Sequence, residues 1–367
     1  MGQDQDGVLL SVSDLTVGYR SRQGTILAVE NIALEIGENQ FVAVVGESGC
    51  GKSTLALAII GLLSIPPARI EKGRIQYKSV NLLALDEGGR RRYRGTEIAM
   101  IFQEPLTSLN PVYKIGDQIA EAIVVREQRD EQVDRVGGRG PMQKAYNSKS
   151  VEVPSRLHLP GLATRARTPA ILDALRRVRI ADPEQVIDRY PFELSGGMRQ
   201  RVMIAMALSQ KPALLLADEP TTALDVTTQA QVLKLMKTLM TEVNTSILLI
   251  THDLAVASQV ADRIIVMYAG ELVEDANVYD LFTEPLHPYT KGLLSCIPTG
   301  SKKDRALKPI PGFVIESSRA IKGCKFASRC SSFMDRCSRE RPALVEARQG
   351  HRVACFLYDE RGGGRNG

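Results

Sequence analysis

The sequence predicts an α/β fold in which helices cover a largely parallel sheet. Two observations lead to this prediction. First, a glycine-rich stretch at residues 46–53 follows an apolar run at 41–45 and precedes a helical stretch at 55–63. Second, the apolar run 214–217 ends in two acids, Asp218 and Glu219. A short run of this kind is typical of a parallel strand buried on both faces, and side chains at its carboxyl end emerge where such sheets bind ligands.

The glycine-rich stretch has the spacing G-x-x-x-x-G-K-S of a phosphate-cradling loop. Glycines let the main-chain N–H groups point inward, Lys52 reaches the outer phosphates, and the Ser53 hydroxyl ligates Mg²⁺. The positive N-terminal end of the following helix faces the anion. A glycine-rich turn of chance resemblance is the alternative, which the flanking strand and helix disfavour. The predicted nucleoside triphosphate contacts are Gly46, Glu47, Ser48, Gly49, Cys50, Gly51, Lys52, Ser53 and Thr54.

The two acids supply chemistry that a binding loop lacks. Asp218 is placed to hold the Mg²⁺ shell, directly or through water, and Glu219 to polarise an attacking water. Paired acids at a strand end can also form a solvated loop edge, but the phosphate loop in the same chain favours the catalytic interpretation. The sequence therefore predicts hydrolysis of the bound nucleotide.

Between these motifs lies L-S-G-G-M at residues 194–198, which resembles the signature of ATP-binding-cassette ATPases. Ser195, Gly196 and Gly197 open a helix predicted to run over 198–208, and their N–H groups form a second anion site. In this family that site closes over the γ-phosphate held by the opposite subunit. The resemblance therefore implies that ATP is hydrolysed in a head-to-tail dimer.

Four further elements occur in the family's order. Gln103, after the apolar run 98–102, resembles the glutamine that touches Mg²⁺ and the attacking water. His252, after a strand at 246–251, resembles the switch histidine that contacts the γ-phosphate. Residues 223–225 resemble the loop that crosses the dimer interface. Tyr19 is the candidate for stacking on adenine, although it could instead pack within its strand.

The predicted organisation is a phosphate-loop ATPase core with an antiparallel β subdomain, an α-helical subdomain and a small Cys-rich C-terminal extension. Strands at 9–17 and 32–35 look antiparallel, and sheet character returns after the helical region. The cassette is expected over 1–285, with its helical subdomain at about 105–190 and a basic insertion at about 127–170, and the C-terminal region over 286–367. Further strands are expected at 213–217, 246–250, 263–267 and 271–274.

Two stretches, 103–111 and 285–294, resemble segments of the oligopeptide, dipeptide and nickel importer ATPases. This resemblance implies an ATPase subunit that pairs with a second ATPase subunit and drives two permease subunits loaded by an extracytoplasmic solute-binding protein. No apolar run reaches the length of a membrane span and no signal peptide is evident, so we expect peripheral attachment at the cytoplasmic face of the plasma membrane. The alternatives are import of nickel or oligosaccharides, or a soluble cassette ATPase acting on nucleic acid.

Four cysteines, Cys324, Cys330, Cys337 and Cys355, gather in the last part of the chain. In a cytosolic protein such a group indicates metal rather than disulfides. The spacing resembles the cysteine tail of the peptide-importer ATPases, which implies a [4Fe–4S] cluster, with Zn²⁺ as the alternative. Basic residues outnumber acidic ones nearby, but without interleaved aromatics no nucleic-acid partner is expected. Cys296 lies outside the spacing and is expected to be a buried small hydrophobe.

Overall fold

The structure is a computed structural model that describes residues 7–22, 24–103, 108–135, 162–222, 224–297, 310–312 and 321–359. It divides into two compact units. Unit 1 consists of residues 1–36, 41–83 and 249–367, and unit 2 consists of residues 37–40 and 84–248. Within the described part of the chain, no helix combines the length and apolarity needed to cross a bilayer.

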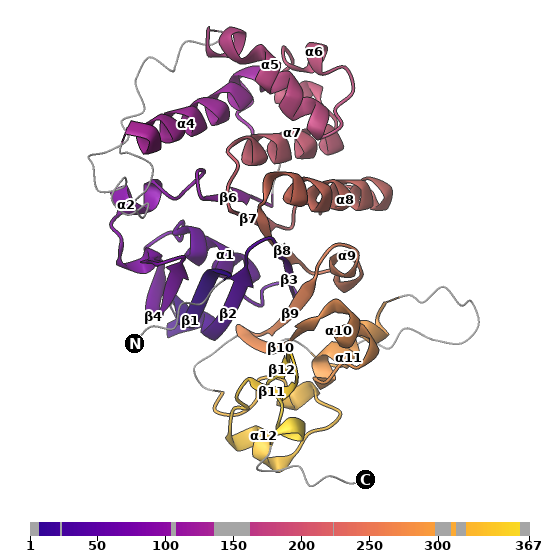
Figure 1. Ribbon diagram of the computed structural model, residues 1–367. Coiled ribbons are helices and arrows are strands. Elements are labelled where there is room, and N and C mark those ends of the chain that lie inside the picture. Colours follow the sequence, from indigo (N-terminus) through magenta and orange to yellow (C-terminus); the bar gives the residue numbers. More distant parts are fainter. Residues whose placement is uncertain are drawn as a thin grey trace, which may run out of the picture. The chain divides into compact units, whose positions relative to one another are not determined.

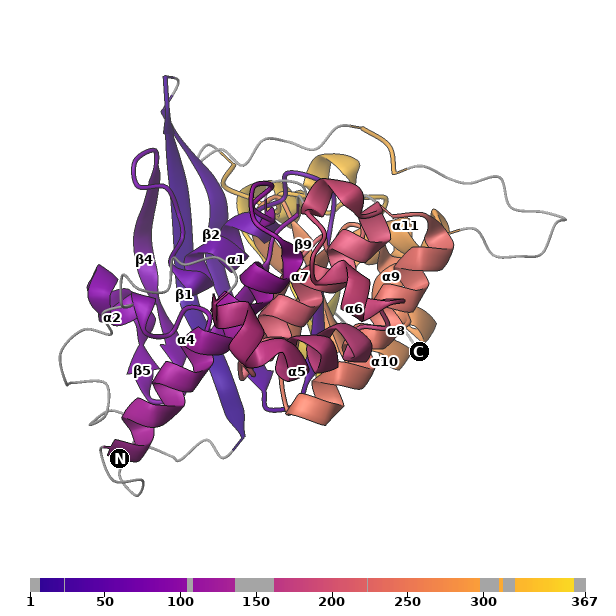
Figure 2. The same ribbon diagram turned by 90° about the horizontal axis from the view of Figure 1, so that it is seen from above.

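Unit 1 contains a four-stranded antiparallel sheet, in which β1, β2 and β4 run side by side (Figure 2). The strands predicted at 9–17 and 32–35 are present, and both are longer than predicted. The strand β4 was not predicted, because Glu71, Lys72 and Arg74 interrupt the apolar alternation that identifies a strand. The sheet order is β2 (Gly24–Gly37), β1 (Val8–Ser21), β4 (Ala68–Tyr77) and β5 (Val80–Asn81).

Unit 1 also holds the strands that carry the phosphate loop. The strand β3 is parallel to β9, and the pairings from β9 through β10 and β12 to β11 are antiparallel. All five residues of β3 are buried, which explains the uninterrupted apolar run. The order is β3 (Phe41–Val45), β9 (Arg263–Tyr268), β10 (Glu271–Asn277), β12 (His351–Val353) and β11 (Val345–Arg348).

The helices of unit 1 are short. The first begins at Lys52, three residues before the predicted start, and ends where Gly61 adopts a left-handed conformation with φ 72°. Such a glycine is a common helix stop, because it has no Cβ to clash. The helices are α1 (Lys52–Ile60), α9 (Leu254–Ser258), α10 (Val278–Thr283), α11 (Pro288–Ser295) and α12 (Asp335–Arg339), with 3₁₀ turns at Ala327–Arg329 and Phe356–Tyr358.

The expected small Cys-rich C-terminal extension is not supported. Main-chain pairing between β12 and β10 joins the C-terminal region to the sheet of unit 1. Buried side chains reinforce this attachment, since His351 Nε2 lies 2.7 Å from Glu274 Oε1 and Lys325 Nζ lies 2.8 Å from Glu30 Oε2. The pattern of cysteines did not reveal these contacts, because the partners lie far away in the chain. The boundary predicted at residue 285, between the cassette and the C-terminal region, stays a prediction.

Unit 2 combines two parallel strands with a group of helices (Figure 1). Helix α4 packs against α5 and α7, and α7 also contacts α8 and β6. The described part of 105–190 contains the helices α4, α5 and α6, whereas 136–161, the centre of the basic insertion, lies outside the described residues. The bounds of the helical subdomain stay a prediction. The elements are α2 (Glu87–Arg91), β6 (Ile98–Ile101), α4 (Ile115–Arg135), α5 (Leu162–Arg177), α6 (Pro183–Val186), a 3₁₀ turn (Pro191–Glu193), α7 (Gly196–Ser209), β7 (Leu214–Asp218) and α8 (Val226–Val243).

Along the chain, β8 (Ser246–Thr251) leads from unit 2 into unit 1, with the division before Leu249. All of its residues are buried, which agrees with the strand predicted there. The 3₁₀ turn Leu82–Ala84 lies where the chain passes from unit 1 into unit 2 before Ala84.

Candidate nucleotide site

The phosphate loop of unit 1 connects β3 to α1, and two of its glycines are required by close main-chain approach. A Cβ on Gly46 would lie 2.2 Å from the carbonyl oxygen of Met267. A Cβ on Gly51 would lie 2.1 Å from the carbonyl oxygen of Ala28, and Gly51 also has φ +102°. Gly51 is the N-cap of α1 and has no side chain to cap the first-turn N–H groups. The positive end of the helix dipole lies at the loop and favours an anion there.

Lys52 is buried inside this loop. Its Nζ donates to the carbonyl oxygens of Gly46 at 2.8 Å and Glu47 at 3.0 Å. The Cys50 sulfur lies 3.8 Å from the same nitrogen, and burial raises the pKa of the Cys50 thiol. The ammonium is thus held at the centre of the curled loop, as expected for a group that binds phosphates.

Tyr19 and Thr54 meet beside the loop. The Tyr19 hydroxyl, from β1, lies 3.2 Å from Thr54 Oγ1 in the first turn of α1. Tyr19 is half-buried rather than enclosed within its sheet. The contact brings the candidate adenine-stacking residue next to the helix that follows Ser53, and its role toward adenine stays a prediction.

In unit 2, three polar side chains gather at the end of β7. Glu219 Oε2 accepts a hydrogen bond from Gln103 Nε2 at 3.3 Å and another from Thr222 Oγ1 at 2.9 Å. The parallel register of β6 and β7, which aligns Ile101 with Ala217, brings Gln103 and Glu219 to the same edge of the sheet. Two residues predicted as catalytic from separate motifs are therefore neighbours. Thr222 was missed by the sequence analysis, although a threonine three residues after an acid is a recognisable turn signal.

Asp218 and Glu219 occupy different surroundings despite being adjacent. Asp218, the last residue of β7, is 5% exposed, while Glu219 is half-buried and has a positive φ of 45°. A left-handed conformation is uncommon for a residue with a side chain and is often found at functional sites. The turn at Glu219 directs the chain away from the strand immediately after the buried carboxylate.

The signature residues open helix α7. Ser195 is the N-cap, and its Oγ accepts a hydrogen bond from the Met198 N–H at 3.3 Å. The helix begins at Gly196, two residues before the predicted start, so Gly196 and Gly197 form its first turn. A Cβ on Gly197 would lie 3.0 Å from Thr228 Cγ2 in α8, so the two helix starts are adjacent.

Helix α8 begins in the stretch predicted to cross the dimer interface. Asp225 is its N-cap and accepts hydrogen bonds from the N–H of Thr228 at 3.0 Å and the Thr228 hydroxyl at 2.7 Å. These bonds, the side-chain bond first, lower the pKa of the Asp225 carboxyl. Ala223, named in the same prediction, lies outside the described residues.

His252 follows β8 and is exposed. It belongs to unit 1, as the phosphate loop does, whereas Gln103, Asp218 and Glu219 belong to unit 2. Its neighbour Asp253 begins α9 by accepting hydrogen bonds from the N–H groups of Ala255 and Val256. The predicted role of His252 toward the γ-phosphate therefore remains a prediction.

The four C-terminal cysteines lie within electrostatic reach of one another. The pKa of the Cys324 thiol is raised to about 12, chiefly by burial and to a smaller extent by the charges of the other three cysteines. Burial also raises the pKa values of Cys330 and Cys355. Cys324 N–H donates to the Cys337 carbonyl oxygen at 2.8 Å, which fixes two of the four positions. None of the six cysteines is in a disulfide.

The cysteines agree only in part with a metal centre. Four thiols are a suitable donor set for a soft metal or an iron–sulfur cluster. However, among the residues that the structure describes, no group of three or more His, Cys, Asp or Glu side chains is arranged to hold a metal ion. Cys296, expected to be buried, is half-buried at the end of α11.

Taken together, the loop and the acid-terminated strand define a phosphate-loop nucleoside triphosphatase. Residues 29–222 match the family described as ABC transporter, and residues 273–337 match the oligopeptide/dipeptide transporter C-terminal region. The chain belongs to the ABC transporter family and is an ATPase of that family.

The chain is similar to relatives over nearly its whole length. The oligopeptide transport ATP-binding protein AppD of Bacillus subtilis (strain 168) is 45% identical over 354 residues, which cover 96% of this chain and 98% of AppD. The dipeptide transport ATP-binding protein DppD of the same organism is 39% identical, with 96% of each chain covered.

A solved structure supports the fold. A dimeric ATP-binding cassette in a post-hydrolysis state, bound to ADP and Pi, has a TM-score of 0.56 and 27% identity. The similarity covers 73% of this chain and 98% of that one. The predicted ABC ATPase fold is therefore confirmed.

Proposed function

We propose that this chain is the ATP-hydrolysing subunit of a prokaryotic importer that takes up oligopeptides or dipeptides through separate permease subunits. The observation that carries the proposal is the match of residues 273–337 to an oligopeptide/dipeptide transporter region, in addition to the cassette match. ATP chemistry alone does not require that region. The names of the relatives, which are similar over their full length, support the same solute class.

In the proposed reaction, the chain's own residues bind the nucleotide and position the water. The loop N–H groups and Lys52 bind the phosphates, and Tyr19 stacks on adenine. Ser53, Gln103 and Asp218 hold Mg²⁺, which neutralises phosphate charge when bound. Glu219 polarises the attacking water, and the hydrogen bond from Gln103 supports its orientation. His252 contacts the γ-phosphate. No covalent intermediate is required.

The proposed active unit is a head-to-tail pair of ATPase subunits. Ser195, Gly196 and Gly197 of one subunit complete the site on the other, with the N-terminus of α7 facing the γ-phosphate. The dimeric state of the similar solved cassette supports this arrangement. The second ATPase subunit is either an identical chain or a related one.

We place the protein at the cytoplasmic face of the plasma membrane, attached through two permease subunits. An extracytoplasmic solute-binding protein would deliver the solute to the complex. The rival solutes are nickel and oligosaccharides, and the rival function is that of a cassette ATPase acting on nucleic acid.

Purification of the tagged chain from its native membranes tests the proposal. We expect two membrane-spanning subunits to co-purify, and peptide-loaded binding protein to stimulate ATP hydrolysis by the complex reconstituted in liposomes. Stimulation by nickel or oligosaccharides but not by peptides would reject the proposed solute. Salt-dependent binding to nucleic acid with no membrane partner would reject the transport function.

For the cysteine group we propose a [4Fe–4S] cluster held by Cys324, Cys330, Cys337 and Cys355, with Zn²⁺ as the alternative. The donor chemistry and the mutual proximity of the thiols support this assignment. The test is an absorption spectrum with iron, sulfide and zinc analysis on anaerobically purified protein. We expect about four iron atoms per chain for the cluster. A colourless sample with stoichiometric zinc would reject iron, and a sample with neither metal would reject both.

A further inference from the structure

A residue from the C-terminal region forms an ion pair with the phosphate loop. Arg329 forms a two-pronged ion pair with the Glu47 carboxylate: Nη1 donates to Oε2 at 2.9 Å and Nη2 to Oε1 at 3.1 Å. The Arg329 side chain is 5% exposed and that of Glu47 is 25% exposed. Glu47 is the second residue of the loop, directly after Gly46. Both partners belong to unit 1.

Arg329 is itself fixed by its surroundings. Its Nε donates to the Pro311 carbonyl oxygen at 2.9 Å, and its Nη1 lies 3.3 Å from the Tyr268 hydroxyl. The guanidinium carbon lies 5.7 Å from the Tyr268 ring centre and 6.0 Å from that of Phe326, in the range of cation–π contacts. A guanidinium held on several sides can therefore restrict the position of Glu47.

The main chain of Glu47 is held from the same region. Its N–H donates to the Tyr289 hydroxyl at 3.1 Å, and Tyr289 is fully buried against Tyr268 and Phe326. The carbonyl oxygen of Glu47 accepts from Lys52 Nζ at 3.0 Å. A shift of Glu47 would therefore also shift the lysine that binds the phosphates.

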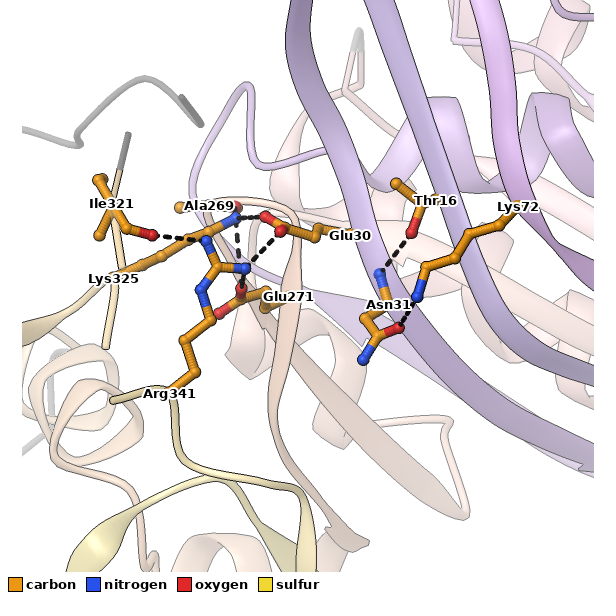
Figure 3. A network of polar contacts seen from close by, with 9 residues as sticks. All are labelled: Thr16, Glu30, Asn31, Lys72, Ala269, Glu271, Ile321, Lys325 and Arg341. Atoms are coloured by element: carbon orange, nitrogen blue, oxygen red, sulfur yellow. Dashed lines mark hydrogen bonds and ion pairs between the residues drawn. The ribbon is translucent and has the colours of Figure 1, made fainter. Parts of the chain in front are cut away.

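A second attachment reaches the other end of the loop. Lys325 Nζ, 1% exposed, donates to the Ala269 carbonyl oxygen at 2.7 Å and pairs with Glu30 at 2.8 Å (Figure 3). The next residue, Gly270, donates its N–H to the Cys50 carbonyl oxygen at 3.0 Å. The segment 325–329 therefore holds the loop directly at Glu47 and, through the turn between β9 and β10, at Cys50.

We propose that Arg329 is a positioning residue for nucleotide binding, which fixes Glu47 and so sets the conformation in which the phosphate loop binds the triphosphate. In this proposal the C-terminal region, which matches the oligopeptide/dipeptide transporter family, also contributes to ATP affinity. The inference rests on the nucleotide-binding function. A bidentate arginine suits this task, because it restrains both carboxylate oxygens at once.

The test measures nucleotide affinity with a fluorescent ATP analogue, together with KM, kcat and the thermal midpoint. We expect Arg329→Met to raise Kd and KM about tenfold with kcat within about twofold, because loop geometry and not the water-activating group changes. Glu47→Gln should have the same effect. The double variant should be no weaker than either single variant, because both remove one interaction. Arg329→Lys should restore part of the affinity.

The control is Arg352→Met, which removes another arginine that ties the C-terminal region to the sheet, through Asp275, without touching the loop. We expect it to leave the Kd unchanged while lowering the thermal midpoint as Arg329→Met does. Wild-type affinity in folded Arg329→Met or Glu47→Gln, or additive losses in the double variant, would overturn the inference. If Arg329→Met does not fold, Glu47→Gln decides. Absence of binding by the wild-type chain would instead overturn the nucleotide function.

Discussion

At the scale of single residues, the carboxylate of Glu219 is held in place by its neighbours in the candidate site. It receives hydrogen bonds from Gln103 and Thr222, and its main chain has a positive φ of 45°. Such a conformation costs about 1–2 kcal/mol for a residue with a Cβ, so the surrounding turn must enforce it. The two donors hold one carboxylate oxygen, Oε2, while an attacking water requires the other or a reoriented carboxylate. The contacts therefore orient the Glu219 carboxylate without burying it completely.

The variant Glu219→Gln tests the role of this carboxylate. We expect nucleotide binding to be retained and turnover to fall by about 10²–10⁴-fold, because an amide cannot polarise the water as a carboxylate does. Phosphate release and binding of a fluorescent ATP analogue would be measured on the same preparation. Unchanged hydrolysis would remove Glu219 from its proposed role.

The variant Thr222→Val tests the residue that only the structure revealed. Removing its hydroxyl should lower kcat about tenfold with little change in KM, because one hydrogen bond that orients Glu219 is lost. The matched control is Thr238→Val, which removes a hydroxyl bonded within α8 to Lys234. Equal kcat values for the two variants would contradict the proposed orientation.

At the scale of elements, the stretch 285–294 is fixed to the strand β10 by buried hydrogen bonds. Glu274, buried on β10, accepts hydrogen bonds from the N–H groups of Leu286 at 2.6 Å and His287 at 2.9 Å. His287 then caps α11, with its Nδ1 accepting from the Tyr289 N–H at 3.0 Å. The stretch therefore forms a packed corner, and it also places the Tyr289 hydroxyl at the phosphate loop.

The cap of α11 predicts a pH dependence of stability. Burial, followed by the charge of Lys291, lowers the pKa of His287 from 6.5 to about 3. Below pH 6.5 the unfolded chain binds a proton at His287 that the folded chain does not bind. The free energy of unfolding is therefore at its full value above pH 6.5 and falls as the pH decreases toward 3. We therefore expect a loss of about 2 kcal/mol in the free energy of unfolding at pH 5.

Urea unfolding at pH 7 and pH 5 would measure this loss. Asparagine cannot titrate but can still cap a helix, so His287→Asn should lose less stability between the two pH values than the wild type does. The comparison at pH 7, where both side chains are neutral, controls for the substitution itself. Equal losses in the two proteins would show that His287 is not responsible.

At the scale of the whole molecule, chemistry is distributed between structural units and, in the proposed mechanism, between subunits. The phosphate loop and His252 belong to unit 1, while Gln103, Asp218, Glu219 and the signature helix belong to unit 2. The proposed mechanism uses residues from both units, and the proposed dimer adds the signature residues of a second subunit.

The variant Ser195→Arg tests the contribution across the dimer. We expect turnover of the assembled complex to fall more than about 100-fold, because a bulky side chain at the start of α7 blocks the approach of the second subunit's γ-phosphate. Nucleotide binding by the isolated chain should be unchanged. Asn277→Arg is the matched control, since Asn277 is also an exposed N-cap, of α10, outside the signature. Full turnover in Ser195→Arg would contradict the shared site.

The sequence by itself determined the nucleotide loop, the strand ending in Asp218 and Glu219, and the signature helix. These features depend on local spacing: glycines at a turn, an apolar run of strand length, and an N-cap serine before two glycines. Their boundaries moved by only two or three residues, as for α1 and α7, because the ends of helices depend on capping details that a short pattern does not specify.

The tertiary structure alone decided which distant residues meet. Arg329 and Glu47 are separated by 282 positions, and Gln103 and Glu219 by 116. The strand β4 and the attachment of the C-terminal region to β10 were likewise invisible in the sequence. A local pattern records which face of an element is apolar and where the chain turns. Ion pairs and strand pairings across hundreds of residues depend on how the whole chain packs, and a single sequence contains no spacing that reports them.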